Sequence, residues 1–227
     1  MKILALETST DYCSCALWCD GEAEQRGQLA QQRHSELLLP MVSDLLNSAS
    51  LRVRDLDGIA FGAGPGSFTG LRIACGVAQG LAFAAGLQVA GVCTLEAMAL
   101  AANSSKVIAA LDARMGQIYV ATYIATDESV RAAEAPRLCD PDDAPLLTGS
   151  GWTAVGNGFA AYRAVLQARY GTQLAVVNAD VFPQAIEVAK LAVRIFASGA
   201  GVPADQATPF YLRDKVALTS HEQQAKR

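Results

Sequence analysis

Apolar residues along the chain follow two periodicities, which together predict a mixed α/β fold. Residues 3–6 form a short continuous apolar run, which predicts a buried strand over residues 2–6. Cys13, Cys15 and Leu17 occupy alternate positions and predict a second strand. A helical stripe follows, in which apolar positions recur at spacings of one and three residues. Its members are Leu37, Leu38, Met41, Val42, Leu45 and Leu46. Because Pro40 lies within the stripe, we expect the helix to kink or to begin near it.

A second strand and helix surround the richest cluster of glycines. Residues 56–61 predict the strand, and the helix is expected to reach about residue 85. The segment between them contains Gly62, Gly64, Gly66, Ser67 and Gly70. No lysine follows as in a P-loop, and the spacing does not match the dinucleotide-binding fingerprint. Two interpretations remain open: a contact for a phosphate or a partner, or a tight turn that lets the helix pack closely on the sheet.

The pattern of the first lobe starts again near residue 105. Residues 108–112 repeat the character of residues 3–7, an apolar run that ends in a carboxylate. The offset is 112 − 7 = 105, and without a gap it places Cys13 on Ile118. This similarity indicates an internal duplication, although two β-hairpins can also resemble each other by chance.

The duplication predicts two lobes. We expect an N-terminal lobe over residues 1–104 and a C-terminal lobe over residues 105–227, with a flexible polar tail from about residue 215.

Composition and charge narrow the range of functions. The chain is 52% hydrophobic and 18% charged, which is a globular composition. Glycine and polar residues interrupt the apolar run 73–90, and the N-terminus lacks a signal-peptide core, so we expect a cytoplasmic protein with no membrane partner. The net charge is −4, and the densest basic segments, 52–54 and 226–227, are short. If RNA is involved, another chain is expected to hold most of it.

Cysteine and histidine do not predict a metal site. None of the six cysteines forms a C-x-x-C pair, and His34 and His221 are the two histidines. Leu38 stands one helical turn after His34, where a second ligand would be needed. We therefore predict no metal and no cofactor, and interpret the cysteines as buried reduced thiols.

Two carboxylates close equivalent strands in the predicted duplication. If Glu7 and Asp112 faced each other across a cleft, they could hold a nucleotide and its Mg²⁺. The first turn is small, but Arg114 and Met115 put bulky side chains in the second, which argues against a working phosphate clamp. We interpret the set as a degenerate nucleotide cleft or a structural loop. Its members are Glu7, Thr8, Ser9, Gly64, Gly66, Ser67, Asp112 and Arg114.

Small residues recur every four positions along the helix after the glycine loop. They are Gly70, Ala74, Ala78 and Ala82. Residues at this spacing share one face, so another helix could approach it closely. That neighbour is either the protein's own core or another subunit, and the spacing alone does not decide between them.

Four segments together resemble the TsaB family, also called YeaZ. They are residues 3–9 (ILALETS), 64–72 (GPGSFTGLR), 110–116 (ALDARMG) and 211–213 (YLR). The run at 64–72 is highly specific, and the resemblance spans nearly the whole chain. Glu7 stands where the family usually has Asp, and Gln117 where it often has Glu; both changes are mild.

The resemblance implies an actin/Hsp70/sugar-kinase-like fold with two duplicated lobes. It also implies a role in making threonylcarbamoyladenosine at position 37 of tRNAs that read ANN codons. In this family TsaB is a non-catalytic paralogue that pairs with the catalytic subunit TsaD, and TsaE, an ATPase, joins the pair. Isolated members often form homodimers, and tRNA is reached only indirectly, through the complex.

The family pairs through helices of the N-terminal lobe. The expected interface here comprises Leu37, Leu38, Met41, Val42, Leu45, Gly70, Ala74, Ala78 and Ala82. The rival interpretation is an ATP-dependent phosphotransferase of the sugar-kinase type, with Glu7 and Asp112 as its metal and phosphate residues.

Overall fold

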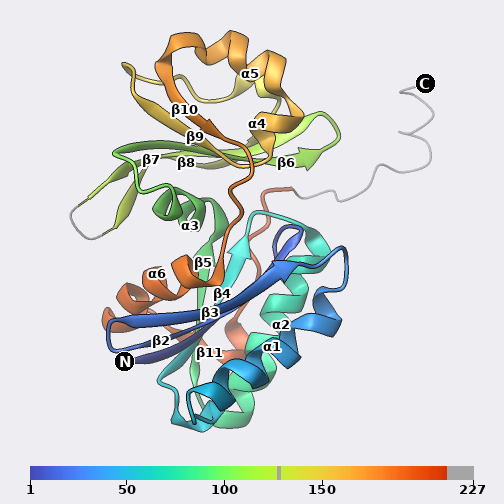
Figure 1. Ribbon diagram of the computed structural model, residues 1–227, viewed down its shortest axis with the longest axis vertical. Coiled ribbons are helices and arrows are strands. Elements are labelled where there is room, and N and C mark those ends of the chain that lie inside the picture. Colours follow the sequence, from blue (N-terminus) through green and yellow to red (C-terminus); the bar gives the residue numbers. More distant parts are fainter. Residues whose placement is uncertain (127–128, 214–227) are drawn as a thin grey trace.

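The computed structural model describes residues 1–126 and 129–213 as two lobes, one above the other (Figure 1). Each lobe has a mixed sheet with helices on both faces, the layered α/β arrangement that the apolar pattern predicts.

The first sheet has the strand order β11-β5-β4-β1-β2-β3. Strands β1, β2 and β3 form an antiparallel meander, and β4 and β5 run parallel to β1. The strands are β1 (Lys2–Glu7), β2 (Tyr12–Cys19), β3 (Glu22–Leu29), β4 (Gly58–Gly64), β5 (Gln88–Cys93) and β11 (Val202–Pro203).

The second sheet repeats this topology in the order β10-β9-β6-β7-β8. Strands β6, β7 and β8 are an antiparallel meander, and β9 and β10 run parallel to β6. The strands are β6 (Lys106–Arg114), β7 (Gln117–Ala125), β8 (Val130–Cys139), β9 (Trp152–Val155) and β10 (Leu174–Asn178). The two-lobed duplication predicted from the sequence is confirmed.

The helices cover the sheets in a crossed arrangement. Helices α1 and α2 cover one face of the first sheet, and α4 and α5 cover the corresponding face of the second. Helix α3 follows β5 of the first lobe but packs on the second sheet, whereas α6 follows β10 and packs on the first. The helices are α1 (His34–Ser48), α2 (Phe68–Ala85), α3 (Thr94–Ala101), α4 (Gly158–Ala161), α5 (Arg163–Tyr170) and α6 (Ala185–Ala197). Short 3₁₀ turns lie at Val53–Asp55, Pro141–Asp143, Gly171–Gln173 and Ala204–Gln206.

The predicted extent of the second lobe, residues 105–227, is wrong. From Ala185 the chain returns to the first lobe, where α6 covers the sheet and Val202 of β11 pairs with Val89 of β5. The reason is that the first sheet is apolar on both faces, and α1 and α2 cover only one. The tail predicted from residue 215 lies outside the described residues.

The ungapped offset of 105 is also wrong for the first strand of the repeat. Leu6 pairs with Cys15, and Ala110 pairs with Val120. Both pairs lie on the sheet face that the lobe's outer helices cover, so they are the equivalent pairs. The offset is therefore 110 − 6 = 104 for the first strand and 120 − 15 = 105 for the second. The turn of the second hairpin is one residue longer.

Helix α2 is apolar along its whole length, although only one side of it is buried in the core. By length and composition alone it could cross a membrane, but a buried helix of a globular core meets the same criteria. Its buried side packs on β4, and Cys13 and Cys15 are buried on the same face of the sheet as free thiols. Helix α1 begins at His34 and continues through Pro40.

The return of α6 predicts that residues 1–104 do not fold by themselves. A fragment of those residues would expose the apolar face that contains Ile3, Ala5 and Val92. We expect no cooperative urea unfolding of this fragment by circular dichroism, while the full chain unfolds cooperatively. A fragment that unfolds cooperatively at the midpoint of the full chain would contradict the assignment of α6 to the first lobe.

Candidate functional site

A cleft between the two lobes encloses a cavity of about 650 Å³. The first lobe lines it with the turn after β1, residues 9–11, and with the N-terminal end of α2. The second lobe contributes the β6–β7 turn, and residues 210–213 close one side. This cleft collects most of the chemistry-bearing residues that the sequence pattern singled out.

The glycine loop lies directly against the turn after β1. Ser67 N donates to Ser9 O at 2.7 Å, and Thr8 Oγ1 donates to Gly70 O at 2.7 Å. A Cβ on Gly66 would lie 2.5 Å from Ser9 O, and one on Gly70 would overlap Thr8 O. The glycines are therefore needed for close backbone packing, which favours the structural interpretation of this loop.

Glu7 is completely buried behind Ser9 and does not line the cleft. Its Oε1 accepts a hydrogen bond from Ser9 N at 2.5 Å, while its Oε2 is buried against Gly62 without a hydrogen-bond partner among the described residues. Loss of solvation raises the pKa of Glu7 from 4.5 to about 7, and hydrogen bonds from Ser9 oppose this rise. A carboxyl group held in this way is poorly placed to bind a cation in the cleft.

Asp112 lines the cleft, but both of its carboxylate oxygens are engaged. Oδ1 accepts hydrogen bonds from Arg114 N at 2.8 Å and from the Tyr162 hydroxyl at 3.1 Å. Oδ2 forms an ion pair with Arg114 Nη1 at 3.1 Å. Asn157 Oδ1 also accepts from Asp112 N at 2.9 Å. Asp112 therefore shapes the second turn and presents no free carboxylate to a ligand.

Glu7 and Asp112 do not face each other across the cleft, as the ungapped offset of 105 suggested. Glu7 alternates with Ala5 and lies on the sheet face covered by α6, whereas Asp112 alternates with Ala110 and lies on the face covered by α4 and α5. The one-residue difference in offset between the lobes causes this divergence. Within residues 1–126 and 129–213, no group of three or more His, Cys, Asp or Glu side chains could hold a metal ion.

Bulky side chains occupy the β6–β7 turn, as the sequence indicated. Arg114, Met115 and Gly116 have φ angles of 62°, 57° and 82°, so three successive residues are left-handed. Arg114 and Met115 both line the cleft. This turn offers side chains where a phosphate clamp needs free backbone amides.

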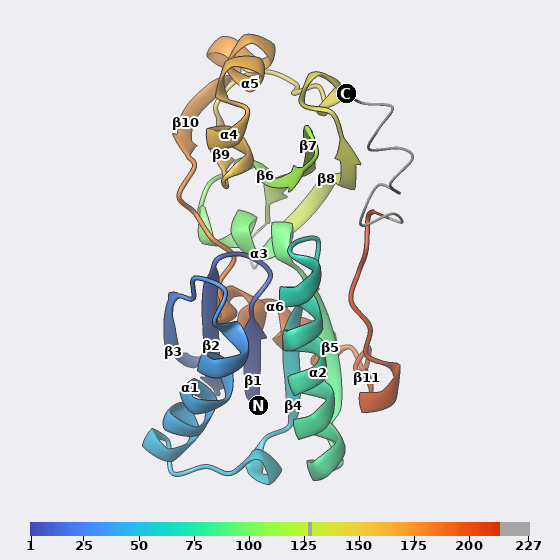
Figure 2. The same cartoon turned by 90° about the vertical axis from the view of Figure 1, so that its right-hand side faces the viewer.

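Residues 210–213, which we name the strap, line the cleft, and their segment of the chain runs from the first lobe towards the second (Figure 2). Phe210 N donates to Ala63 O at 2.7 Å in the first lobe. Arg213 Nη2 donates to Ala113 O at 3.1 Å in the second. From the sequence, residues 211–213 stood out only as part of the family resemblance, because nothing in their pattern places them beside the cleft.

His34 supports the turn after β1. It is buried, and its Nε2 lies 2.8 Å from Thr10 O. The side chain thereby connects the start of α1 to the wall of the cleft.

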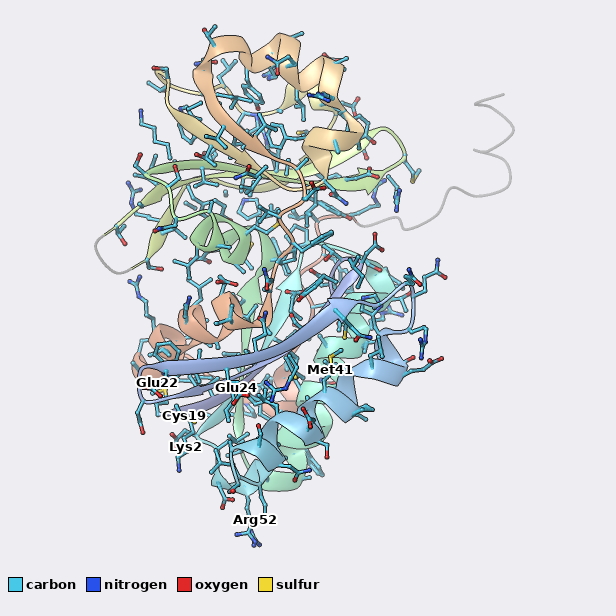
Figure 3. The ribbon with its side chains drawn as sticks, in the orientation of Figure 1. Lys2, Cys19, Glu22, Glu24, Met41 and Arg52 are labelled. Atoms are coloured by element: carbon cyan, nitrogen blue, oxygen red, sulfur yellow. The ribbon has the colours of Figure 1, made fainter. Side chains whose placement is uncertain are left out.

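The expected interface residues lie mostly in the core, which corrects the predicted contact face. Leu37 and Met41 are partly exposed on α1; Met41 is labelled in Figure 3. The buried members are Leu38, Val42, Leu45, Gly70, Ala74, Ala78 and Ala82. Their side of each helix faces the first sheet, because the sheet needs an apolar cover on this face.

A different set of small residues lies on the exposed side of α2. Gly76, Gly80 and Ala84 are exposed and share the four-residue spacing, and a Cβ on either glycine would meet no atom within 4 Å. Phe83 beside them is 81% exposed. The sequence contained both stripes, and the position of the sheet decides which one faces outward.

The buried carboxyl of Glu7 predicts that stability falls as pH rises. The folded protein holds the Glu7 proton up to about pH 7, whereas the unfolded chain releases it near pH 4.5, so stability decreases between these values. The shift corresponds to about 3 kcal/mol. We expect Glu7→Gln to remove most of this pH dependence in urea unfolding measured at about pH 5 and pH 8.5.

The matched control is Glu22→Gln, which removes an exposed carboxylate from β3. If both variants alter the pH dependence equally, burial of Glu7 is not its cause.

Comparison with known proteins agrees with the fold and the cleft. A family model for TsaD, described as tRNA N6-adenosine threonylcarbamoyltransferase, matches residues 26–220. The tRNA threonylcarbamoyladenosine biosynthesis protein TsaB of Escherichia coli (strain K12) is 37% identical over 229 residues, which cover 96% of each chain. The protein of the same description from Haemophilus influenzae is 35% identical over 232 residues, which cover 95% of each.

A solved structure agrees as well. YeaZ from Pseudomonas aeruginosa matches with a TM-score of 0.87 at 37% identity, over 93% of this chain and 99% of that one. The duplicated lobes, the glycine loop packed on the first turn and these relatives together show that the chain belongs to the TsaB (YeaZ) family of tRNA threonylcarbamoyladenosine biosynthesis proteins.

Proposed function

We propose that this protein is a non-catalytic subunit that binds and supports TsaD in making threonylcarbamoyladenosine at position 37 of tRNAs that read ANN codons. The names of its relatives and the match to the TsaD model support the pathway. The observation that carries the non-catalytic role is the β6–β7 turn, where the side chain and the backbone N–H of Arg114 both bind the carboxylate of Asp112. Asp112, one of the two carboxylates that the phosphotransferase interpretation requires, is thus held by Arg114, and Glu7, the other, lies outside the cleft.

The exposed side of α1 and α2 is the surface that we assign to the partner. Gly76 and Gly80 allow another helix to approach the backbone of α2 closely. Ile73 and Val77 of α2 and Met41 of α1 are partly exposed beside them, so a partner would bury a continuous apolar strip. An isolated chain would cover the same strip by forming a homodimer.

The wider assembly follows from the same proposal. TsaE would join the heterodimer, the pair would act in the cytoplasm, and the partner would hold most of the tRNA. No cofactor is assigned to this chain.

Pairing is tested by the mass of the complex after gel filtration with TsaD from the same source. We expect one copy of each chain in the wild-type complex. Gly80→Arg should stay folded, because position 80 is exposed and arginine favours helix more than glycine does. It should weaken pairing by at least about tenfold, since the new side chain prevents close approach.

Ala168→Arg, on the exposed side of α5, is the matched control and should pair normally. Ala78→Arg is unsuitable as a test, because Ala78 is fully buried and the variant would unfold. Pairing of Gly80→Arg at wild-type affinity would exclude the α2 face as the interface.

The rival function is an ATP-dependent phosphotransferase, which the size of the cleft alone favours. We expect no ATP turnover above background from the purified protein, because Asp112 is engaged and Glu7 lies outside the cleft. Turnover that disappears in Asp112→Asn would support the phosphotransferase and contradict the purely supporting role.

A further inference from the structure

A basic and aromatic surface lies at the mouth of the cleft, where α2, the strap and the β6–β7 turn meet. We name it the mouth surface and define it by five residues. They are Arg72, Arg114, Phe210, Tyr211 and Arg213. Phe210 is 43% exposed and Tyr211 is 40% exposed, so the aromatic side chains remain accessible.

Contacts among Phe68, Arg72 and Tyr211 hold the aromatic part of the mouth surface in place. The guanidinium of Arg72 lies 3.7 Å from the centre of the Phe68 ring, and its Nε donates to the Tyr211 hydroxyl at 3.1 Å. The rings of Phe68 and Tyr211 have centres 5.5 Å apart. The contact with Phe68 and the hydrogen bond from Arg72 restrict the orientation of Tyr211, so that little side-chain entropy is lost when a planar group stacks on it.

Two of the three arginines of the mouth surface are not neutralised by carboxylates of the described residues. Arg72 and Arg213 have no ion-pair partner in the part of the chain that the structure describes. Arg213 instead donates to Ala113 O, Arg114 O and Met115 Sδ. Only Arg114 shares its charge with a carboxylate, that of Asp112. The mouth surface is thus locally positive on a chain whose net charge is −4.

We propose that the mouth surface contacts RNA directly, with its arginines on backbone phosphates and Tyr211 stacked on an unpaired base. This inference rests on the proposed function, which supplies tRNA as the RNA. Guanidinium groups bind phosphates through paired hydrogen bonds, and exposed aromatic rings stack on splayed bases of single-stranded RNA. The expectation that tRNA is reached only through the partner changes accordingly: the partner holds most of it, and this surface adds a second contact.

Arg52 and Arg54, the basic residues that precede Arg72 in the sequence, lie far from the mouth surface. Arg52 stands at the end of the first lobe farthest from the second (Figure 3). It pairs with Asp55, and the neighbouring Arg54 is exposed without an ion pair among the described residues. Arg52 resembles Arg114, because each is paired with a carboxylate, and Arg54 resembles Arg72, because neither has an ion pair among the described residues. Substituting Arg52 and Arg54 together is therefore the matched control.

The test is a fluorescence anisotropy titration of an unmodified tRNA that reads an ANN codon with the heterodimer, at several salt concentrations. We expect Arg72→Gln with Arg114→Gln to weaken binding roughly tenfold and to reduce the salt slope by about two, because two phosphates are then no longer bound by an arginine. Arg52→Gln with Arg54→Gln should leave both quantities unchanged. Urea unfolding and the mass of the complex show that each double variant is folded and paired.

A second pair of variants tests stacking separately from charge. Tyr211→Phe keeps the ring and loses the bond from Arg72, whereas Tyr211→Ser removes the ring. We expect Tyr211→Phe to bind the tRNA within about twofold of wild type and Tyr211→Ser to bind it severalfold more weakly.

Equal affinity and equal salt slope for the two arginine double variants would overturn the RNA contact while leaving the proposed pairing intact. Loss of pairing with TsaD in the Arg72 and Arg114 variant would instead assign the surface to a protein partner, and would also overturn it. If the wild-type chain does not pair at all, the proposed function fails. The same titration with this chain alone then decides whether the mouth surface binds RNA.

Discussion

The close contact between the glycine loop and the turn after β1 is the constraint on which the rest of the cleft depends. Two backbone segments meet through the bonds Ser67 N to Ser9 O and Thr8 Oγ1 to Gly70 O, with no space for a Cβ on Gly66 or Gly70. This contact sets where α2 begins, because Ser67 caps the helix through Gly70 N. The start of α2 then positions Phe68 and Arg72, which in turn hold the strap.

The exchange of helices makes the two lobes interdependent. Each lobe sends the helix after its last parallel strand to the sheet of the other lobe, so neither sheet is fully covered by its own segment. Ser14 of β2 reinforces this connection, because its Oγ accepts from Ala185 N at the start of α6 at 3.0 Å. The strap adds a second connection along the cleft.

Two neighbouring surfaces therefore suggest a division of roles. The α1–α2 strip is apolar and includes exposed glycines, which would allow a partner helix to approach closely. The mouth surface is basic and aromatic, as an RNA contact requires. Both include residues of α2, so a partner and an RNA bound at the same time would lie next to each other.

The sequence by itself determined the local elements and the family. Alternation and helical spacing located β1, β2, β4, the repeated hairpin β6–β7, α1 and α2, but not β3 or β8. The run at residues 64–72 identified the TsaB family, because these signals depend on neighbouring residues. The crowding of the second turn by Arg114 and Met115 was also visible, since bulky side chains are read directly from the chain.

Only the tertiary structure decided what depends on contacts between distant segments. The position of the first sheet determines which face of α2 is buried, so Ala78 lies in the core and Gly80 is exposed. The strand register placed Glu7 and Asp112 on different faces, because a shift of one residue reverses a side chain in a strand. The return of α6 to the first lobe, and the proximity of Arg72, Arg114 and Arg213 at one surface, follow from how the two lobes pack. Spacing along the sequence does not encode that proximity, since residues so far apart meet only after the lobes have packed.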